Sequence, residues 1–255
     1  MTEGGAQPTG ILGGRVTLLQ PPRSVYRSGS DAVLLASVLP AGFSGAAVDL
    51  GAGTGAVGFC VAARCTGATV LCVDSDEGAI TLASAALALE ANQGFAGRVA
   101  TGLGDIEAVP EAWNPPVAPV DAVLFNPPYV RPGHGRISPD EQRQRARTLG
   151  EDGLLPWFGA VRRLLKPGGL FGAIAPPAFL GEMLQEGFGG ASIYPIQSRS
   201  SEPAKRIVVT AFEGRKAGPQ IMPALVMHGA GKAFTPVAQS LLRGDICLGE
   251  ACSIR

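Results

Sequence analysis

The 255-residue sequence predicts an α/β fold, with a seven-stranded, mostly parallel sheet, helices on both faces and an antiparallel last strand. Two observations support this prediction. From residue 46 onward, short apolar runs alternate with longer helical stretches, which is typical of βαβ units. The last two runs, at 192–196 and 206–212, have no helix between them, so we expect them to pair as a hairpin.

The same pattern divides the chain into four segments. We expect a flexible tip, a strand-and-helix segment packed on the core, the α/β domain itself and a C-terminal extension, at residues 1–12, 13–45, 46–216 and 217–255. The extension shows little pattern, so its role stays open.

In the first half, apolar runs and the prolines, glycines and caps that bound them predict the helices and strands. A short strand and a proline break precede a helix around "AVLLASVL", for which Ser30 or Asp31 is the expected N-cap. Strands and helices then alternate as strand 46–50, helix 55–65, strand 69–74, helix 76–92, strand 97–106 and strand 120–125.

The second half begins with an amphipathic helix at 153–169, which Pro167 and the following glycines are expected to stop. Three strands follow, at 170–176, 192–196 and 206–212. In the tail, "FTPVAQSLLRG" predicts a short helix with Thr235 as N-cap, Pro236 in the first position and Gly244 just past the end.

Composition narrows the class of protein. Hydrophobic residues make up 46% of the chain, yet no apolar run reaches the ~18 residues of a membrane span. The polar, acidic start does not resemble a signal peptide. Five cysteines without a CxxC pair indicate reduced thiols and a cytoplasmic protein. We expect no metal site, and the sequence leaves a monomer and a homodimer open.

Charge is unevenly distributed along the chain. Residues 1–130 carry 5 basic and 11 acidic side chains, a net charge of −6, and residues 131–255 carry 16 and 10, a net charge of +6. Such asymmetry can mark a face that binds an anion, although solvated charges can also fall this way by chance.

A glycine-rich turn follows the strand at 46–50. The stretch "VDLGAGTGAVG" places Asp49, Gly51, Gly53 and Gly55 in D-x-G-x-G-x-G, between a strand and a helix. Glycines there let the backbone turn tightly and approach a ligand closely. With Gly58 the turn also satisfies G-x-G-x-x-G, so a dinucleotide-binding enzyme is an alternative, on a weak match.

Two further acids end the next two strands. Asp74 could accept both ribose hydroxyls of a nucleoside cofactor, and Asp105, followed by Ile106, could accept from an adenine amino group. With Asp49 they form an acidic rim, which would repel a pyrophosphate but suits a sulfonium and an ammonium. The rim therefore favours S-adenosylmethionine (SAM) over NAD as the cofactor.

The fourth strand runs into "DAVLFNPPYV", in which Asn126, Pro127, Pro128 and Tyr129 form a stiff, extended corner. Such a corner presents an amide, a carbonyl and an aromatic ring beyond the strand end. It is suited to holding a flat polar group.

Together, "DLGAGTG", "VDSDEGAI", "GDI" and "NPPY" resemble a class I, Rossmann-like SAM-dependent methyltransferase over about residues 46–213. NPPY is similar to the motif of the N6-adenine and N5-glutamine methyltransferases. "LLQPPRSVYRSGSDAVLLAS" and "EPAKRIVVTAF" are similar to segments of the bacterial valine-tRNA adenine-N6 methyltransferase family. The resemblance implies methylation of the adenine just 3′ of the anticodon in a tRNA.

The resemblance also implies roles for the corner. Asn126 and the Pro127 carbonyl would each accept one N–H of the target nitrogen, Tyr129 would stack on the base, and the prolines would keep the corner rigid. Pro128 is also expected to contact the substrate, and Asn126 the cofactor. Basic residues would contact tRNA phosphates, foremost Arg131, Arg145, Lys205 and Arg206, beside Arg199, Arg215 and Lys216. Solvated surface charge is the alternative for each of them.

Four other functions stay open at this stage. A release-factor-type glutamine N5-methyltransferase uses the same corner, although such enzymes have a larger N-terminal domain than the 45 residues available here. An adenine in ribosomal RNA or DNA is a second possible substrate. A catalytically inactive SAM-binding scaffold and a nicotinamide oxidoreductase are the third and fourth.

Overall fold

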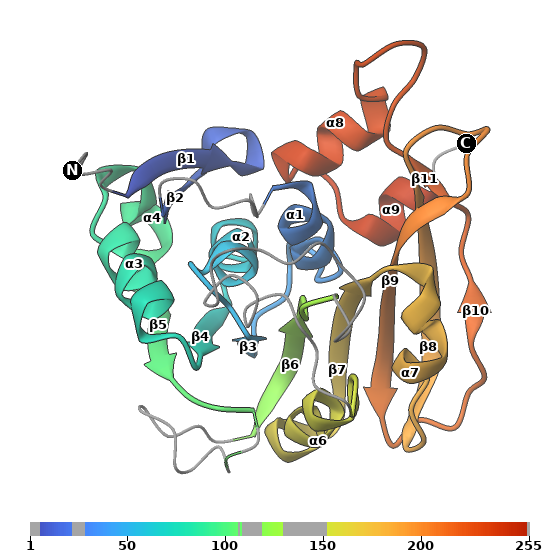
Figure 1. The fold of residues 1–255 in the computed structure, drawn as a ribbon, viewed down its shortest axis with the longest axis horizontal. Helices are drawn as coiled ribbons and strands as arrows, with labels where there is room; N and C mark the ends of the chain where they lie inside the picture. Colours follow the sequence, from blue (N-terminus) through green and yellow to red (C-terminus); the bar gives the residue numbers. More distant parts are fainter. Residues whose placement is uncertain (1–5, 22–28, 107, 109–118, 130–151, 254–255) are drawn as a thin grey trace.

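The computed structural model describes residues 6–21, 29–106, 108, 119–129 and 152–253. Within them, one large sheet has the strand order β10-β8-β9-β7-β6-β3-β4-β5, with β11 also paired to β8 (Figure 1). The strands β5, β4, β3, β6 and β7 are mutually parallel, and β9 runs antiparallel to both β7 and β8. The predicted mostly parallel α/β sheet with an antiparallel last strand is confirmed.

Strands β3, β4, β5 and β6 have five or six residues, and β7, β8 and β9 have ten or eleven. Their bounds are β3 Ala46–Leu50, β4 Thr69–Asp74, β5 Val99–Leu103, β6 Val120–Phe125, β7 Leu165–Ala175, β8 Phe188–Gln197, β9 Ala204–Glu213, β10 Gln220–Ile221 and β11 Leu225–Val226. The seven predicted strands are therefore present, and the two-residue β10 and β11 extend the sheet beside β8.

Helices cover both faces of the sheet, as the alternation of apolar residues along each strand requires. One face packs against α1 Ser30–Ala36, α2 Ala56–Arg64, α3 Glu77–Leu87, α4 Gln93–Ala96, α8 Pro236–Arg243 and α9 Leu248–Ser253. The other packs against α6 Leu155–Leu164 and α7 Leu180–Met183, as Figure 1 shows. In β6, Ala122 and Leu124 belong to the first core, while Val123 and Phe125 belong to the second.

A small second sheet forms near the start of the described chain. Strand β1 (Gln7–Ile11) pairs antiparallel with β2 (Val16–Gln20). The sequence predicts a flexible tip at residues 1–12, and this is wrong for residues 7–11, which form a strand. This segment contains Pro8 and Gly10, which are uncommon inside strands, so its sequence does not indicate one. Its partner β2 supplies the hydrogen bonds that order it.

The predicted helix at 76–92 is broken. Helix α3 ends at Leu87, and Leu89 leaves the helical conformation with a ψ of 140° before a 3₁₀ turn at Glu90–Asn92. The fully buried Asn92 side chain accepts from the Thr17 amide and donates to the Thr17 and Ala86 carbonyls. The two bonds to Thr17 tie the chain to β2, a tertiary contact that no local residue signals, and the third holds Asn92 to the end of α3.

The predicted helix at 153–169 is also shorter than expected. Helix α6 ends at Leu164, and Leu165 already belongs to β7, where it pairs with Val120. Pro167 and the glycines therefore lie inside an irregular first part of β7, and they do not stop the helix. Pairing with β6 outweighs the helical pattern of the sequence here.

The C-terminal segment is part of the fold. Thr235 caps α8 by accepting from the Ala238 amide at 3.2 Å, and Gly244 ends it in the left-handed region, as predicted. The Leu248 amide donates to Ser37 beside α1, and the buried Arg64 guanidinium donates to carbonyls of Ala36, Leu39 and Ile246. Among the described residues, no helix is long and apolar enough to span a membrane.

Candidate active site

The glycine turn after β3 lies at the carboxyl edge of the sheet. Gly51, Gly53 and Gly55 all have positive φ angles, of 69°, 53° and 85°. A Cβ at Gly51 would lie 2.4 Å from the Trp157 ring, so the turn requires a residue without a side chain there. A Cβ at Gly53 would meet nothing within 4 Å, which leaves open space against that backbone. The turn therefore packs against the core at Gly51 and offers bare backbone at Gly53.

Asp49 lies beneath this turn. Its side chain is only 2% exposed, and its Oδ2 accepts from the Gly58 amide at 2.7 Å, in the first turn of α2. The sequence predicts a cofactor-binding role for Asp49. In the structure its carboxylate fixes the start of α2 against β3. Burial raises the pKa of Asp49 from 3.8 to about 7, partly offset by the Gly58 hydrogen bond.

Asp74 closes the turn from the neighbouring strand. Its Oδ2 accepts from the Gly53 amide at 2.7 Å, and its Oδ1 accepts from the Asp76 amide at 2.9 Å. Partial burial raises the pKa of this carboxyl, against the lowering effect of those two bonds. A carboxylate oxygen can accept more than one hydrogen bond, so both oxygens retain capacity for a ribose hydroxyl.

Asp105 and Ile106 follow the end of β5, the strand next to β4. Asp105 is exposed, and its carbonyl accepts from the Ala108 amide at 3.1 Å. The Ile106 carbonyl accepts from Arg163 Nη2 at 2.6 Å. Arg163 thus anchors this loop to α6. The three acids become progressively more exposed, in the order Asp49, Asp74, Asp105.

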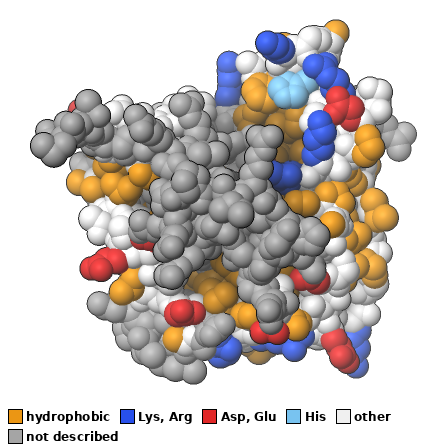
Figure 2. All heavy atoms as spheres, in the orientation of Figure 1, with side chains coloured by type: hydrophobic (Ala, Val, Ile, Leu, Met, Phe, Trp, Pro, Cys, Tyr) orange, Lys and Arg blue, Asp and Glu red, His pale blue; other side chains and the backbone are white. Residues whose placement is uncertain are grey.

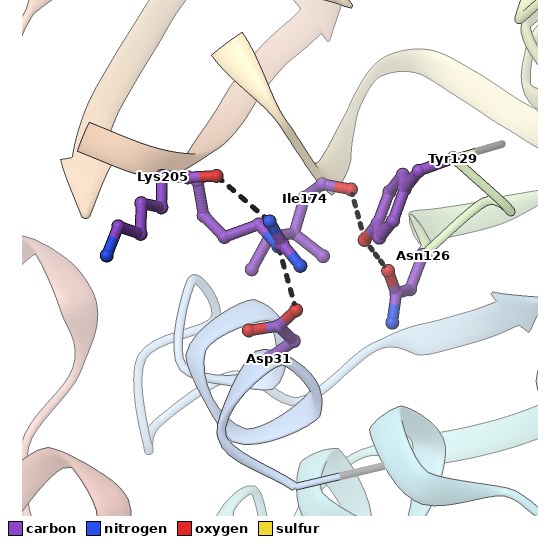
Figure 3. A network of polar contacts seen from close by, with 6 residues as sticks. Asp31, Asn126, Tyr129, Ile174 and Lys205 are labelled. Atoms are coloured by element: carbon purple, nitrogen blue, oxygen red, sulfur yellow. Dashed lines mark hydrogen bonds and ion pairs between the residues drawn. The ribbon is translucent and has the colours of Figure 1, made fainter. Parts of the chain in front are cut away.

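The corner at Asn126 follows β6, which lies directly beside β3. Pro127 is buried, and Asn126, Pro128 and Tyr129 are partly exposed. The Tyr129 hydroxyl faces the Asn126 Oδ1 and the Ile174 carbonyl, the latter at 3.1 Å (Figure 3). Of the predicted catalytic residues, Asn126 and Tyr129 are therefore hydrogen-bonded to each other at the end of β6, with Pro127 between them in the chain.

Of the predicted substrate-binding cations, the structure brings one to the corner. The Arg206 guanidinium carbon lies 5.2 Å from the centre of the Tyr129 ring, and Arg206 Nε pairs with Asp31 at 3.1 Å. Lys205 points away from Tyr129 in Figure 3 and pairs with Glu202 at 2.8 Å. Arg131 and Arg145 lie outside the described residues.

The structure places two further cations away from the site and corrects one predicted cap. Arg215 and Lys216 follow the far end of β9, so the antiparallel direction of that strand carries them to the edge opposite the site. Asp31 does not cap α1, whose N-cap is Gly29. Its position within "SGSDAVLLAS" is typical of a cap. In the folded chain its carboxylate pairs instead with Arg206 on β9.

The geometry fits a SAM site. The strand order reverses between β3 and β6, and ligands of such open sheets bind outside the carboxyl ends of the strands at this point. Asp74, the open backbone at Gly53 and the exposed Asp105 surround that position from one side, and the Asn126 corner bounds it on the other. The carboxylates suit a cofactor that carries positive charge.

Comparison with known proteins gives the family. Residues 27–155 match the methyltransferase small domain, and the chain belongs to that family. The protein is a SAM-dependent methyltransferase, and SAM is its cofactor.

Two curated relatives resemble the chain. It is 26% identical over 218 residues to the tRNA1(Val) (adenine(37)-N6)-methyltransferase of Aeromonas salmonicida, covering 84% of this chain and 87% of that one. It is 33% identical over 132 residues to a release factor glutamine methyltransferase of Gloeobacter violaceus, covering 48% of this chain and 43% of that one.

Solved structures share the fold. A predicted O-methyltransferase of Agrobacterium tumefaciens superposes with a TM-score of 0.71 at 29% identity, covering 85% of this chain and 97% of that one. The 16S rRNA N2 G1207 methyltransferase of Thermus thermophilus, solved with AdoMet and guanosine, superposes with a TM-score of 0.56 at 21% identity, over 82% and 50% of the two chains.

Replacing Asp74 tests the cofactor side of the site. Asp74→Ala should weaken SAM binding on the order of tenfold or more, because it removes the carboxylate beside the glycine turn. Titration of tryptophan fluorescence is a suitable measurement, since Trp157 packs against Gly51. Asp74→Asn, which keeps an acceptor for the Gly53 amide, separates loss of charge from collapse of the turn. Unchanged affinity in Asp74→Ala would remove Asp74 from the cofactor site.

The pKa of Asp49 gives a second prediction. The folded protein holds this proton more tightly than the unfolded chain, so the stabilising contribution is full below about pH 4 and disappears as pH rises through about 7. Between pH 5 and 8 the unfolding free energy of Asp49→Asn should therefore fall less than that of the wild type, by roughly 2–3 kcal/mol.

Urea denaturation at several pH values, without SAM, measures this difference. Asp121→Asn is the matched control, because Lys166 lowers the pKa of Asp121 and its titration falls below this window. Parallel pH profiles of the wild type and Asp49→Asn would contradict the raised pKa.

Proposed function

We propose that this enzyme methylates the exocyclic N6 amine of an adenine in RNA, and that its substrate is a tRNA with the target adenine next to the anticodon. The observation that supports this most directly is the corner formed by Asn126 and Tyr129, set beside the glycine turn by the pairing of β6 with β3. The relative named as a tRNA adenine-N6 methyltransferase matches over 84% of this chain, which supports the same substrate. Such a substrate would be met in the cytoplasm.

The corner is suited to a planar nitrogen. The lone pair of an exocyclic amine is delocalised into the ring, which makes the amine a poor nucleophile. Asn126 Oδ1 and the Pro127 carbonyl would accept its two N–H groups and draw the nitrogen toward tetrahedral geometry. The prolines restrict the backbone, so these acceptors need no rearrangement when the amine arrives. Bound SAM supplies an electrophilic methyl group.

The same groups argue against oxygen as the methyl acceptor. An alcohol or phenol needs a base that removes its proton, whereas an amide oxygen and a proline carbonyl accept hydrogen bonds without taking up a proton at neutral pH. The predicted O-methyltransferase that shares the fold therefore does not decide the chemistry. Tyr129 would stack on the base, a contact worth ~1–3 kcal/mol per base.

A basic surface near the site supports an RNA substrate. Figure 2 shows Lys and Arg side chains gathered around a histidine at the upper right. Arg199 and Lys205 lie on the β8–β9 connection and at the start of β9, and Arg199 Nη1 donates to the Gly229 carbonyl at 3.0 Å. In this proposal Lys205, Arg131 and Arg145 contact phosphates, in a salt-dependent manner.

The second candidate is glutamine N5-methylation of a release factor. An amide nitrogen is also planar and would fit the same two acceptors. The 33% identity to such an enzyme favours it, but that match spans 132 residues and 43% of the relative.

Methyl transfer from labelled SAM separates the two. The acceptors are total tRNA from a strain that lacks this enzyme and, in parallel, purified release factors. Label in tRNA that digests to N6-methyladenosine supports the proposal. Label in the release factor alone contradicts it and assigns the second function.

Asn126→Ala tests the mechanism. The variant should lower kcat by roughly 10²–10³-fold, because it removes one of two oriented acceptors. Its SAM affinity should stay within about threefold of wild type, opposite to Asp74→Ala, so each variant is the control for the other. Single-turnover methyl transfer and SAM titration give the two values. Full activity in Asn126→Ala would exclude the proposed role of the corner.

A further inference from the structure

Three separate elements meet around the Tyr129 ring. Arg206, near the start of β9, pairs through Nε with Asp31 Oδ2 in the first turn of α1, at 3.1 Å. The Arg206 Nη1 donates to the Lys205 carbonyl at 3.0 Å. The guanidinium so held lies 5.2 Å from the centre of the Tyr129 ring. Asp31 and Tyr129, which contact it, come from separate elements (Figure 3).

The ring is fixed at its other end by its hydroxyl. That hydroxyl has one proton and faces two acceptors, Asn126 Oδ1 and the Ile174 carbonyl on β7. It can donate fully to only one of them at a time. Tyr129 is thus linked to the amide oxygen on which the proposed chemistry depends. When an incoming N–H binds Asn126, the Tyr129 hydroxyl can donate to the Ile174 carbonyl instead.

The surroundings of Arg206 do not match those of a simple phosphate contact. Its side chain is 34% exposed and that of Asp31 24%, so the pair is partly screened by water and adds little to stability by itself. A planar guanidinium over an aromatic ring is directional, however, and a carboxylate on one of its edges fixes its plane.

We propose that Asp31 and Arg206 are positioning residues, which hold the Tyr129 ring and, through its hydroxyl, the Asn126 amide in the orientation that receives the planar nitrogen of the substrate. The inference rests on the proposed function in taking that nitrogen to belong to an RNA base. It assigns Asp31 to the site and gives Arg206 a role other than phosphate binding.

Asp31→Asn separates this role from phosphate binding by the direction of its effect. If Arg206 binds phosphate, removing its carboxylate partner frees the guanidinium and removes a negative charge, so KM for tRNA falls and kcat is unchanged. If the pair positions Tyr129, kcat falls and KM for tRNA changes little. Arg206→Lys should behave like Asp31→Asn, because an ammonium keeps the charge but lacks the planar group.

The experiment compares these two variants with Glu202→Gln, which breaks the neighbouring Lys205 ion pair but does not touch Tyr129. We expect kcat on tRNA to fall on the order of tenfold in Asp31→Asn and Arg206→Lys, with SAM affinity and melting temperature close to wild type. Glu202→Gln should keep the wild-type kcat. An unchanged kcat with a lower KM in Asp31→Asn would overturn the proposal.

A second measurement needs no substrate. The chain has three tyrosines, so protein labelled with fluorotyrosine gives three ¹⁹F resonances, and Tyr129→Phe identifies one of them. Asp31→Asn and Arg206→Lys should shift or broaden the Tyr129 resonance, and Glu202→Gln should not. A Tyr129 resonance unaffected by both variants would overturn the inference even if tRNA proved not to be the substrate. A wild-type enzyme inactive on tRNA would contradict the proposed function alone.

Discussion

The site depends on the parallel pairing of β3 with β6. Leu50 lies opposite Phe125 in that register, so the next residue of each strand, Gly51 and Asn126, begins its loop at the same level of the sheet. The strand order reverses between these two strands, which leaves the space above their ends clear of a crossover helix. Trp157 supports both loops at once: it stacks on Phe125 with ring centres 5.7 Å apart and lies against Gly51. The glycine turn and the start of the Asn126 corner therefore both depend on the packing of Trp157.

Burial decides what each strand-end acid can do. Asp49, Asp74 and Asp105 give the same signal in the sequence, a carboxylate at the end of an apolar run. The buried Asp49 accepts a hydrogen bond from the Gly58 amide through Oδ2 and so supports the turn from below. Asp74 is shared between the turn and the space above it, and Asp105 faces solvent. The three acids of the predicted rim therefore differ in exposure, from the buried Asp49 through the partly exposed Asp74 to the exposed Asp105.

Local sequence patterns predicted the elements whose bounds are set by neighbouring residues. The strands at 46–50, 69–74 and 120–125 and the capped helix α8 have the expected bounds, because apolar runs, a threonine cap and a left-handed glycine set them directly. The sequence could not show where α3 ends, since that depends on Asn92 binding β2 across 75 positions of chain. The same holds for Asp31, which occupies a cap-like position and finds its partner 175 residues away. Long-range contacts override the local signal in each of these places.

The direction of β9 determines which basic residues of the second half of the chain lie near the site. Because β9 runs antiparallel, its first residues lie at the carboxyl edge of the parallel strands, and Arg215 and Lys216 beyond its end are carried to the opposite edge. Successive side chains of a strand point to opposite sides, so Lys205 and Arg206 diverge. Lys205 stays on the surface, whereas Arg206 turns to Asp31 and Tyr129. The Arg206–Asp31 ion pair thus joins the basic second half of the chain to the acidic first half. It lies at the corner where the substrate nitrogen would be held.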